Sequence, residues 1–358
     1  MRLTTNRIVQ SLLFIGLGFT VLYSFRSQPT SQVQKPPSWE IAFEQPFEEA
    51  RPFSEGLAVI GQRGRYGYID KTGKVVVEPQ FQQARDFSDG MARITMKDKE
   101  GYINRDGVVI IKPQFEDAFD FTEGLAQVDL GPKRGGYIDK TGTIVINTNL
   151  TSATEFSEGL AAASGPRDTD PYMYIDRTGK IKIATEYTGA RPFYEGMASV
   201  WIKPEHRSNR GWGFIDRTGQ VVIPPEFDAI GEKFSEGLVQ VRVGRKWGYL
   251  DKTGKMLIGA RFDEADDFSE GLALVKVVGT YGFIDKNGQY VVEPRFTLAS
   301  RFSEGVASVC EQGKFGYIDK SGKFVIEPQF ESADSFSEGL ALVALNGKVA
   351  YIKLVTSK

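Results

Sequence analysis

The 358-residue sequence contains a single cysteine and a single histidine. Because Cys310 has no second cysteine to pair with, the sequence neither requires nor excludes an oxidising compartment. Because His206 stands alone, no histidine cluster can bind a metal, and a Ser-His-Asp or Cys-His arrangement could form only around that residue. These two scarcities exclude most histidine-based metal centres and most nucleophilic triads.

The sequence also lacks an excess of charge of either sign. Lysine and arginine together number 44, against 46 aspartates and glutamates. A chain with this balance has no net field that would attract a polyanion or an anionic bilayer, so we expect no nucleic-acid partner. The sequence contains no Gly-rich phosphate loop, no HExxH motif and no CxxC motif. We therefore expect no cofactor and no bound metal.

Charge is missing altogether from residues 8–25, which lie between Arg7 and Arg26. An uncharged run that follows a basic start is typical of an export signal, and this one has about the minimum length of a membrane-spanning helix. We interpret residues 1–25 as a signal peptide or signal anchor helix and favour the uncleaved anchor. Residues 26–38 are polar and contain proline, so we interpret them as a tether. Both readings place residues 39–358 outside the cytoplasm, in the periplasm or at the cell surface.

The sequence is rich in repetition. A motif Phe-x-(Glu/Asp)-Gly-(Leu/Met/Val), or a close variant, occurs nine times, with its glycine at positions 56, 90, 124, 159, 196, 237, 271, 305 and 339. A second motif, aromatic-Gly-(Tyr/Phe)-Ile-Asp-(Lys/Arg)-(Thr/Ser/Asn)-Gly, follows in some form, most clearly in residues 315–322. An apolar run that ends in Pro-x-Phe comes next, as in residues 324–330. The commonest spacing between successive glycines of the first motif is 34 residues (90 − 56).

Each unit predicts three short strands and a shorter fourth. Residues 271–275, 281–285 and 289–293 carry the apolar, aromatic and β-branched side chains that favour strands. Asp285 and Gly288 predict a turn, since an aspartate side chain accepts backbone N–H bonds and glycine tolerates a positive φ. No stretch after residue 40 has the period of an amphipathic helix. We therefore predict an all-β fold, a tandem array of eight to nine antiparallel β-meander units of about 34 residues each.

The two ends of the array predict how it closes. Residues 39–56 match the end of a unit, and residues 339–353 match the beginning of a unit without its third strand. Together they would complete one more sheet, as in propellers. We favour propeller-like closure over an open β-superhelix.

These motifs resemble those of the WG-repeat family, also written KWG, over residues 41–353. The Trp-Gly pair of the family stands at residues 212–213 and 247–248. Elsewhere the tryptophan is replaced by Tyr66, Tyr281 or Phe315, or is lost, as at Glu100, Gly135 and Val349. The resemblance implies a bacterial β-repeat protein, of a kind commonly exported or fused to other modules. It implies no established activity and supplies no catalytic residue.

The repeated acidic residues are candidates for chemistry. The aspartate of the second motif, such as Asp70, offers one carboxylate beside a lysine or arginine, whereas Ca²⁺ prefers six or more oxygen ligands. The glutamate of the first motif, such as Glu55, could belong to the carboxylate pair of a glycosidase. A residue found in nearly every unit is better explained by a backbone role in every unit. We interpret both residues, and the phenylalanines of Pro-x-Phe, as structural, and we expect no enzymatic activity.

Differences among the units point to a binding region. The distance from the glycine of the first motif to the glycine position of the second is 11 residues in unit 1 (67 − 56), but 12, 14 and 17 in units 3, 4 and 5 (136 − 124, 173 − 159, 213 − 196). The added residues fall in one hairpin loop, and loops that depart from a rigid scaffold commonly carry binding. Neutral drift in exposed hairpins is the alternative. The candidate partner-binding residues are Arg167, Asp168, Asp170, Tyr172, Trp201, Lys203, His206, Arg207, Arg210 and Trp212.

We expect a non-catalytic, extracytoplasmic scaffold that presents these loops to a protein partner, with a cell-wall polymer as a second partner class. The alternative is a carbohydrate- or cell-wall-binding module or a glycan-active enzyme, and a purely structural spacer is a third possibility. Contact with a membrane is expected only through the N-terminal segment. Cys310 occupies a variable strand-end position in a regular unit, which argues against a nucleophile. The sequence leaves the ligand and the oligomeric state open.

Overall fold

The computed structural model describes residues 38–131, 135–150, 152–165, 167, 170–202 and 211–355. All of them belong to the second of two units into which the chain divides, residues 36–358. The predicted signal or anchor, residues 1–25, and all but the last residue of the predicted tether lie outside the described residues. Within the ranges described, no helix is long and apolar enough to cross a membrane.

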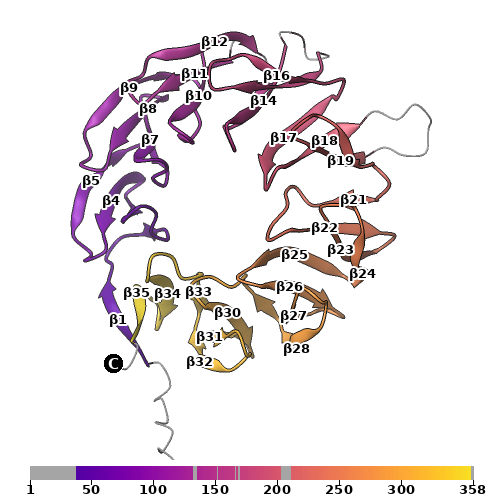
Figure 1. Cartoon of the computed structure of the whole chain (residues 1–358). Helices are drawn as coiled ribbons and strands as arrows, with labels where there is room; N and C mark the ends of the chain where they lie inside the picture. The colour runs from indigo at the N-terminus through magenta and orange to yellow at the C-terminus, as the bar shows by residue number, and fades with distance from the viewer. Residues whose placement is uncertain are drawn as a thin grey trace, which may run out of the picture. The chain divides into compact units, whose positions relative to one another are not determined.

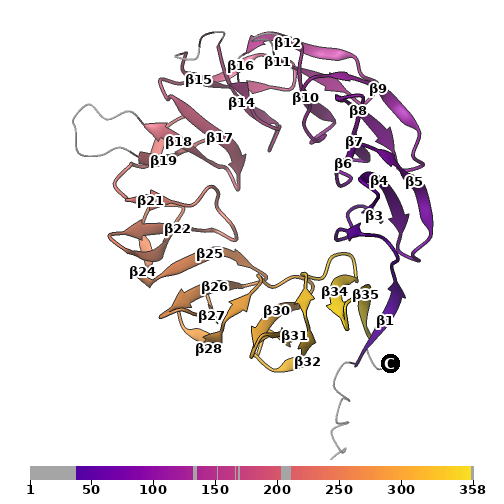
Figure 2. The ribbon, with the colours of Figure 1, turned by 180° about the vertical axis from the view of Figure 1, so that it is seen from behind.

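The described residues form nine small antiparallel sheets arranged in a ring, which is a nine-bladed β-propeller (Figure 1). Successive repeats follow one another around the ring, so each unit of the sequence supplies one blade (Figure 2). The predicted all-β fold and the propeller-like closure are therefore confirmed. The fourth strand predicted for each unit is present as the innermost strand of eight blades, with two residues in six of them and six residues in β17 and β25. In blade 3 it is reduced, among the described residues, to an isolated bridge between Ala118 and Val128.

In most blades the chain runs from the innermost strand to the outermost; the described part of blade 3 has three strands, and the outermost strand of blade 9 is β1. Blade 1 consists of β2 (Glu49–Ala50), β3 (Leu57–Gln62), β4 (Arg65–Asp70) and β5 (Val75–Phe81); blade 2 of β6 (Gln83–Ala84), β7 (Met91–Met96), β8 (Lys99–Asn104) and β9 (Val109–Phe115); blade 3 of β10 (Leu125–Asp129), β11 (Gly135–Asp139) and β12 (Ile144–Leu150). Blade 4 consists of β13 (Ser152–Ala153), β14 (Leu160–Ser164), β15 (Tyr172–Asp176) and β16 (Ile181–Ala184); blade 5 of β17 (Gly189–Tyr194), β18 (Met197–Ile202), β19 (Gly211–Asp216) and β20 (Val221–Ile223); blade 6 of β21 (Ala229–Ile230), β22 (Leu238–Val243), β23 (Lys246–Asp251) and β24 (Met256–Phe262). Blade 7 consists of β25 (Glu264–Ser269), β26 (Leu272–Val277), β27 (Thr280–Ile284) and β28 (Tyr290–Phe296); blade 8 of β29 (Leu298–Ala299), β30 (Val306–Glu311), β31 (Lys314–Asp319) and β32 (Phe324–Phe330); blade 9 of β33 (Ser332–Ala333), β34 (Ala341–Leu345), β35 (Lys348–Val355) and β1 (Ser38–Glu44).

Blade 9 closes the ring with strands from both ends of the described chain. The N-terminal strand β1 pairs antiparallel with β35, with Ser38 opposite Val355 and Glu44 opposite Ala350. The first three strands of this blade come from residues 332–355 and the outermost from residues 38–44. This is the closure that the incomplete units at the two ends predict.

The glycine of the second motif allows two strands of a blade to approach closely. Opposite Gly67, the register of β4 and β5 shifts, so that Tyr66 pairs with Phe81 and Tyr68 with Val77. A β-carbon placed on Gly67 would lie 2.2 Å from the carbonyl oxygen of Val77. The bulge that carries the Pro-x-Phe proline therefore passes over a site where only glycine fits.

The core lies between neighbouring blades. The aromatic residue after the second-motif glycine packs against the first-motif phenylalanine of the next blade, with ring centroids 4.7–5.0 Å apart at every junction. Where this residue is tyrosine, its buried hydroxyl donates to a backbone carbonyl of the next blade, as from Tyr68 to Arg85 (2.7 Å). At the closing junction Tyr351 makes the same bond to Arg51 (2.6 Å). The phenylalanines of Pro-x-Phe are also largely buried, as predicted, with Phe81 2% exposed.

Candidate interaction face

The ring has two chemically different faces. Because successive strands of a blade are antiparallel, the chain reverses alternately at the two ends of each blade. The Glu-Gly turns of the first motif and the Asp-x-x-Gly turns of the second lie on one face, which we call the seam face. The turns between the second and third strands, and the crossovers from one blade to the next, lie on the other, which we call the hairpin face.

On the seam face, the Glu-Gly turn of each blade is a two-residue reversal with a positive φ at both residues. At Glu55 and Gly56 the φ values are 53° and 86°, as in a type I′ turn. Ser54 and Leu57 exchange two backbone hydrogen bonds across it. A positive φ is uncommon for glutamate, so its recurrence calls for a compensating interaction.

That interaction is a hydrogen bond to the next blade. The carboxylate of the turn accepts the N–H of the following blade's turn glycine at 2.5–3.1 Å, in the pairs Glu338–Gly56, Glu55–Gly90, Asp89–Gly124, Glu123–Gly159, Glu158–Gly196, Glu195–Gly237, Glu236–Gly271, Glu270–Gly305 and Glu304–Gly339. At seven of these junctions a lysine or arginine of the next blade also pairs with the carboxylate, as in Arg105–Glu55 (2.8 Å). Burial by itself would raise the pKa of Glu55, but Arg105 and the Gly90 N–H outweigh it and lower the pKa. The structural interpretation of these glutamates is confirmed.

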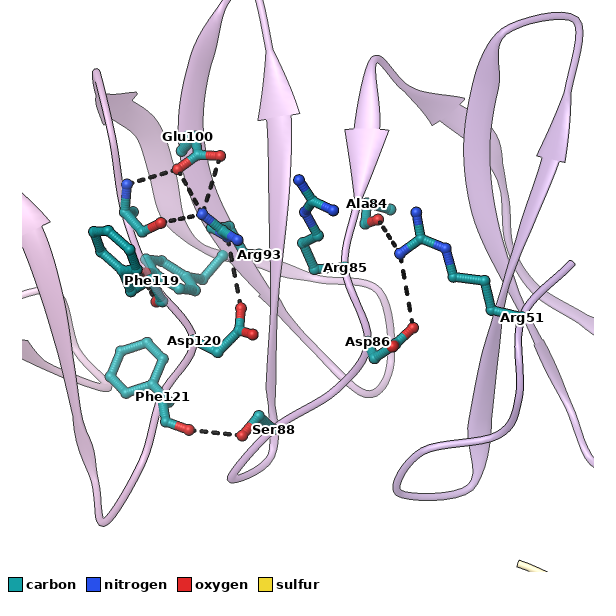
Figure 3. A network of polar contacts seen from close by, with 12 residues as sticks. Arg51, Ala84, Arg85, Asp86, Ser88, Arg93, Glu100, Phe119, Asp120 and Phe121 are labelled. Atoms are coloured by element: carbon teal, nitrogen blue, oxygen red, sulfur yellow. Dashed lines mark hydrogen bonds and ion pairs between the residues drawn. The ribbon is translucent and has the colours of Figure 1, made fainter. Parts of the chain in front are cut away.

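In seven blades the residue before the Glu-Gly or Asp-Gly pair is a serine, and its hydroxyl adds a second hydrogen bond to the next blade. The Ser54 hydroxyl donates to the carbonyl of Phe87 in the next blade (2.8 Å), and Ser88 donates to Phe121 (2.8 Å; Figure 3). Across the closing junction, Ser337 donates to Phe53 (2.7 Å). The seam face thus holds the ring together with the same contacts at one junction after another.

The aspartates of the second motif are turn caps. The Asp70 carboxylate accepts the backbone N–H groups of Thr72 (2.9 Å) and Lys74 (3.1 Å) and the Thr72 hydroxyl (2.6 Å). The same set recurs at Asp139, Asp176, Asp216, Asp251 and Asp319. Capping lowers the pKa of the Asp70 carboxyl, with the Thr72 side chain as the largest cause. The structural interpretation of this residue is confirmed as well.

The hairpin face differs from blade to blade, and it carries the predicted binding region. In most blades the turn between the second and third strands is short, as at residues 63–64 between β3 and β4. In blades 4 and 5 the corresponding connections are residues 165–171 and 203–210. Asp168, Lys203, His206, Arg207 and Arg210 lie outside the described residues. The other five candidate residues are placed by the structure.

In blade 4, Arg167 and Asp170 form a local turn. The Arg167 guanidinium and its backbone N–H both donate to the Asp170 carboxylate, at 2.8 and 3.0 Å. The Arg167 side chain is 81% exposed, whereas that of Asp170 is 14% exposed. Tyr172 sits in the aromatic position of the repeat, and its hydroxyl lies 3.0 Å from the Ser152 hydroxyl. Arg167 is thus available to a partner, while Tyr172 belongs to the junction with blade 5.

In blade 5, Trp201 and Trp212 are cross-strand neighbours on β18 and β19. Their rings meet edge to face, with centroids 5.7 Å apart. Gly189 on β17 makes room for them, since a β-carbon there would lie 3.0 Å from the β-carbon of Trp201. The Arg191 guanidinium covers the Trp212 ring at 4.2 Å. The structure therefore brings Trp201 and Trp212 together in a half-buried cluster.

Two residues beside this cluster, Arg191 and Glu232, could not be found from the lengths of the loops. Arg191 lies on the inner strand of blade 5, and Glu232 follows the inner strand of blade 6; they form an ion pair at 3.2 Å between the blades. The Glu232 carbonyl also accepts the Ser199 hydroxyl (3.0 Å). The signal in the sequence is Gly189, which stands where blade 1 has Glu49. Aligning the inner strands would have revealed it.

Comparison with known proteins agrees with the geometry. The family model for the WG-containing repeat matches nine segments, residues 47–66, 66–99, 101–131, 136–164, 172–200, 212–247, 247–279, 281–315 and 315–348. No curated protein matches the sequence.

Three solved structures resemble this chain to different degrees. A crystal structure of the eukaryotic initiation factor superposes with a TM-score of 0.57 at 11% identity, covering 90% of this chain and 93% of that one. BamB from Moraxella catarrhalis gives a TM-score of 0.42 at 9% identity, over 90% and 98% of the two chains. The WD40 β-propeller domain of Doa1 gives 0.30 at 13% identity, over 68% and 93%. At 11% identity, the likeness to the initiation factor shows a shared fold alone.

Proposed function

Because the chain belongs to the WG-containing repeat family, we propose that it is a non-catalytic scaffold that binds a protein partner through the hairpin face of its propeller. Repeat arrays of this kind present extended surfaces on a rigid frame, which suits a protein-interaction scaffold. The difference between the two faces of the ring favours the hairpin face as the binding surface.

The observation that carries the proposal is this contrast. The seam face repeats the same carboxylate-to-glycine bond at nine junctions, so its polar groups are already engaged in holding the ring. The hairpin face varies in length and composition, most of all in blades 4 and 5. Exposed arginine and half-buried tryptophan, as in Arg167, Trp201 and Trp212, are residue types enriched at interfaces. A partner that contacts this face would leave the ring-closing bonds undisturbed.

The same proposal places the propeller outside the cytoplasm. The support is the uncharged run of residues 8–25 behind two arginines, with residues 26–38 as a tether. Labelling of intact cells with a membrane-impermeant reagent, on a variant with a cysteine introduced in the hairpin turn at residue 63, tests this placement. Labelling before cell lysis is expected, and labelling only after lysis would contradict it.

Replacement of a loop tests the binding face. Residues 203–210 are exchanged for the two-residue Arg-Gly turn of blade 1, residues 63–64, which the same fold already accommodates. The matched control carries the same Arg-Gly dipeptide in place of residues 278–279 in the short turn of blade 7. Affinity purification of the full chain from envelope extracts is expected to lose its specific partner with the first variant and keep it with the second. Equal recovery with both variants would contradict a role for the blade 5 loop.

A further inference from the structure

A recurring ion pair links the blades on the hairpin face. In blades 2, 6 and 8 the first residue of the third strand is a lysine that pairs with an acidic residue 17 positions later, in the crossover to the next blade, as in Lys246–Asp263 (2.6 Å). Lys314–Glu331 (3.5 Å) and the close pair Lys99–Glu116 repeat the arrangement. Asp263 also accepts the backbone N–H of Val278 (2.7 Å), which lies in the hairpin turn of the blade that follows the crossover.

The junction of blades 1 and 2 keeps the hydrogen bond and loses the ion pair. Arg65 holds the basic position, but the residue 17 positions later is Gln82. The Gln82 side chain still accepts the N–H of Asp98 (3.0 Å) and donates to the Asp98 carboxylate (2.9 Å). Being neutral, it cannot pair with Arg65, and no ion pair within the described ring engages this arginine.

Two adjoining cavities open at this junction. One, of about 390 Å³, is lined by Arg51, Tyr66, Gln82 and Arg85 among others, and lies within the range of small-ligand pockets, roughly 300–1,000 Å³. The other, of about 240 Å³, shares Gln82 and adds Arg65 and Lys97. Together the linings hold four cationic side chains and no carboxylate. The nearby Glu49 carboxylate accepts the Tyr66 hydroxyl (3.1 Å).

The arginines of the larger cavity are weakly engaged. The Arg51 guanidinium reaches the Asp86 carboxylate only at 3.9 Å and the Ala84 carbonyl at 3.5 Å. Arg85 is exposed and, in the part of the chain that the structure describes, makes no ion pair. In Figure 3 its side chain stands free, whereas Arg93 in the next junction is held by Glu100 and Asp120. Arginine suits a carboxylate ligand because its planar guanidinium can bind both carboxylate oxygens.

We propose that the groove between blades 1 and 2 binds the carboxylates of an acidic segment of a protein partner. One carboxylate takes the place next to Arg65 that Glu116, Asp263 and Glu331 occupy in other junctions. A neighbouring carboxylate lies between Arg51 and Arg85. The inference rests on the proposed protein-binding function but concerns blades 1 and 2, so it can fail while the blade 5 loop still binds, and the reverse.

Fluorescence anisotropy of a labelled peptide of alternating glutamate and alanine, titrated with the full chain, tests the proposal. The glutamate peptide is expected to bind, more weakly as salt is raised, whereas an otherwise identical glutamine peptide is expected not to bind. Loss of one charge-assisted contact in Arg85→Gln is expected to weaken binding by about tenfold or more. Absence of binding by the glutamate peptide, or equal binding of both peptides, would overturn the proposal.

A variant that restores the missing acidic partner of Arg65 distinguishes binding in the groove from a general effect of the protein's charge. Gln82→Glu reproduces the residue found in other junctions, so it is expected to fold, to pair with Arg65 and to weaken peptide binding by about tenfold. Gln289→Glu makes the same chemical change at an exposed position of the seam face and is expected to leave binding unchanged. Equal affinity of the Gln82→Glu variant and the parent would refute the assignment. So would inorganic phosphate that displaces the peptide from the parent more effectively than free glutamate does, because the site would then select phosphate.

The reverse substitution provides a gain of function. Glu116→Gln removes the exposed carboxylate from Lys99 in the next junction and recreates the vacancy there. An additional, weaker binding site for the glutamate peptide is expected. An unchanged stoichiometry and affinity in this variant would show that a vacant basic position does not by itself attract a carboxylate, which contradicts the reasoning.

Discussion

Phe43 tests whether the ring is closed by the N-terminal strand. It lies on β1, its ring is 4.9 Å from that of Tyr351 and 6.5 Å from that of Phe53, and it packs against Gly73 in the turn of blade 1. It therefore joins strand β1 to blade 9 and blade 9 to blade 1. Val77, Ile258 and Val292 hold the same position in other blades, each against the turn glycine of the next blade.

We expect Phe43→Ala to lower the free energy of unfolding by about 2 kcal/mol. A fully buried phenylalanine costs about 3–5 kcal/mol on truncation to alanine, and Phe43 is only half-buried, so the lower figure applies. Ile258→Ala, in an interior junction of the chain, serves as the matched control and is expected to cost about 3 kcal/mol, because Ile258 is 3% exposed. Urea denaturation followed by tryptophan fluorescence measures both.

The result distinguishes a closed ring from an open array. In a closed ring the junction of blades 9 and 1 is equivalent to any other, so both variants lose stability and keep a single unfolding transition. In an open array β1 would be a frayed end. A loss below about 0.5 kcal/mol for Phe43→Ala, beside a full loss for Ile258→Ala, would refute closure.

Three further outcomes follow from the contacts of the repeat. Gly316→Ala is expected to destabilise the fold by more than about 2 kcal/mol, because its β-carbon would lie 2.5 Å from the Ile326 carbonyl oxygen, whereas Gly259→Ala, with nothing within 4 Å, should stay within about 0.5 kcal/mol in the same denaturation assay. The folded state lowers the pKa values of Glu55, Glu195, Glu236 and Glu338 below the ordinary glutamate value of about 4.5, so in acid the unfolded chain binds more protons than the folded chain. The urea midpoint should therefore be flat near neutrality and fall as the pH drops from about 4.5 through the lowered values. A midpoint that does not depend on acid would contradict this. Gly189→Ala is expected to displace Trp201 and shift the tryptophan emission with the ring intact, and an unchanged spectrum would contradict the observed packing.

The repeated features of this protein could be predicted from its sequence because each is set locally or recurs at a fixed period. Turn residues such as Asp70 and Gly73 act within a few residues of themselves, and a glutamate repeated at every turn is recognisable as structural before its partner is known. The incomplete units at the two ends gave the closure for the same reason. Both kinds of inference depend on comparing the units with one another.

The contacts between blades could not be predicted in the same way. The pairing of Arg191 with Glu232, and the vacancy at Arg65, depend on which side chains of two blades face each other across a junction. That arrangement follows from the strand register and from the crossover of the ring, so the offset of 17 residues between Lys246 and Asp263 has no meaning in the sequence until the blades are placed. Loop length distinguishes blades 4 and 5 in the sequence, but it carries no information about the groove between blades 1 and 2.

Site-specific photo-crosslinking on the two faces tests the central claim most directly. A photoreactive residue is placed in the full chain at Arg63, Arg167 or Val278 on the hairpin face, and at Thr72, Thr218 or Asn287 on the seam face. All six positions lie in exposed turns. Crosslinks to one partner from hairpin-face positions, and none to it from seam-face positions, are the predicted result. Crosslinks to that partner that come mainly from the seam face would contradict the account.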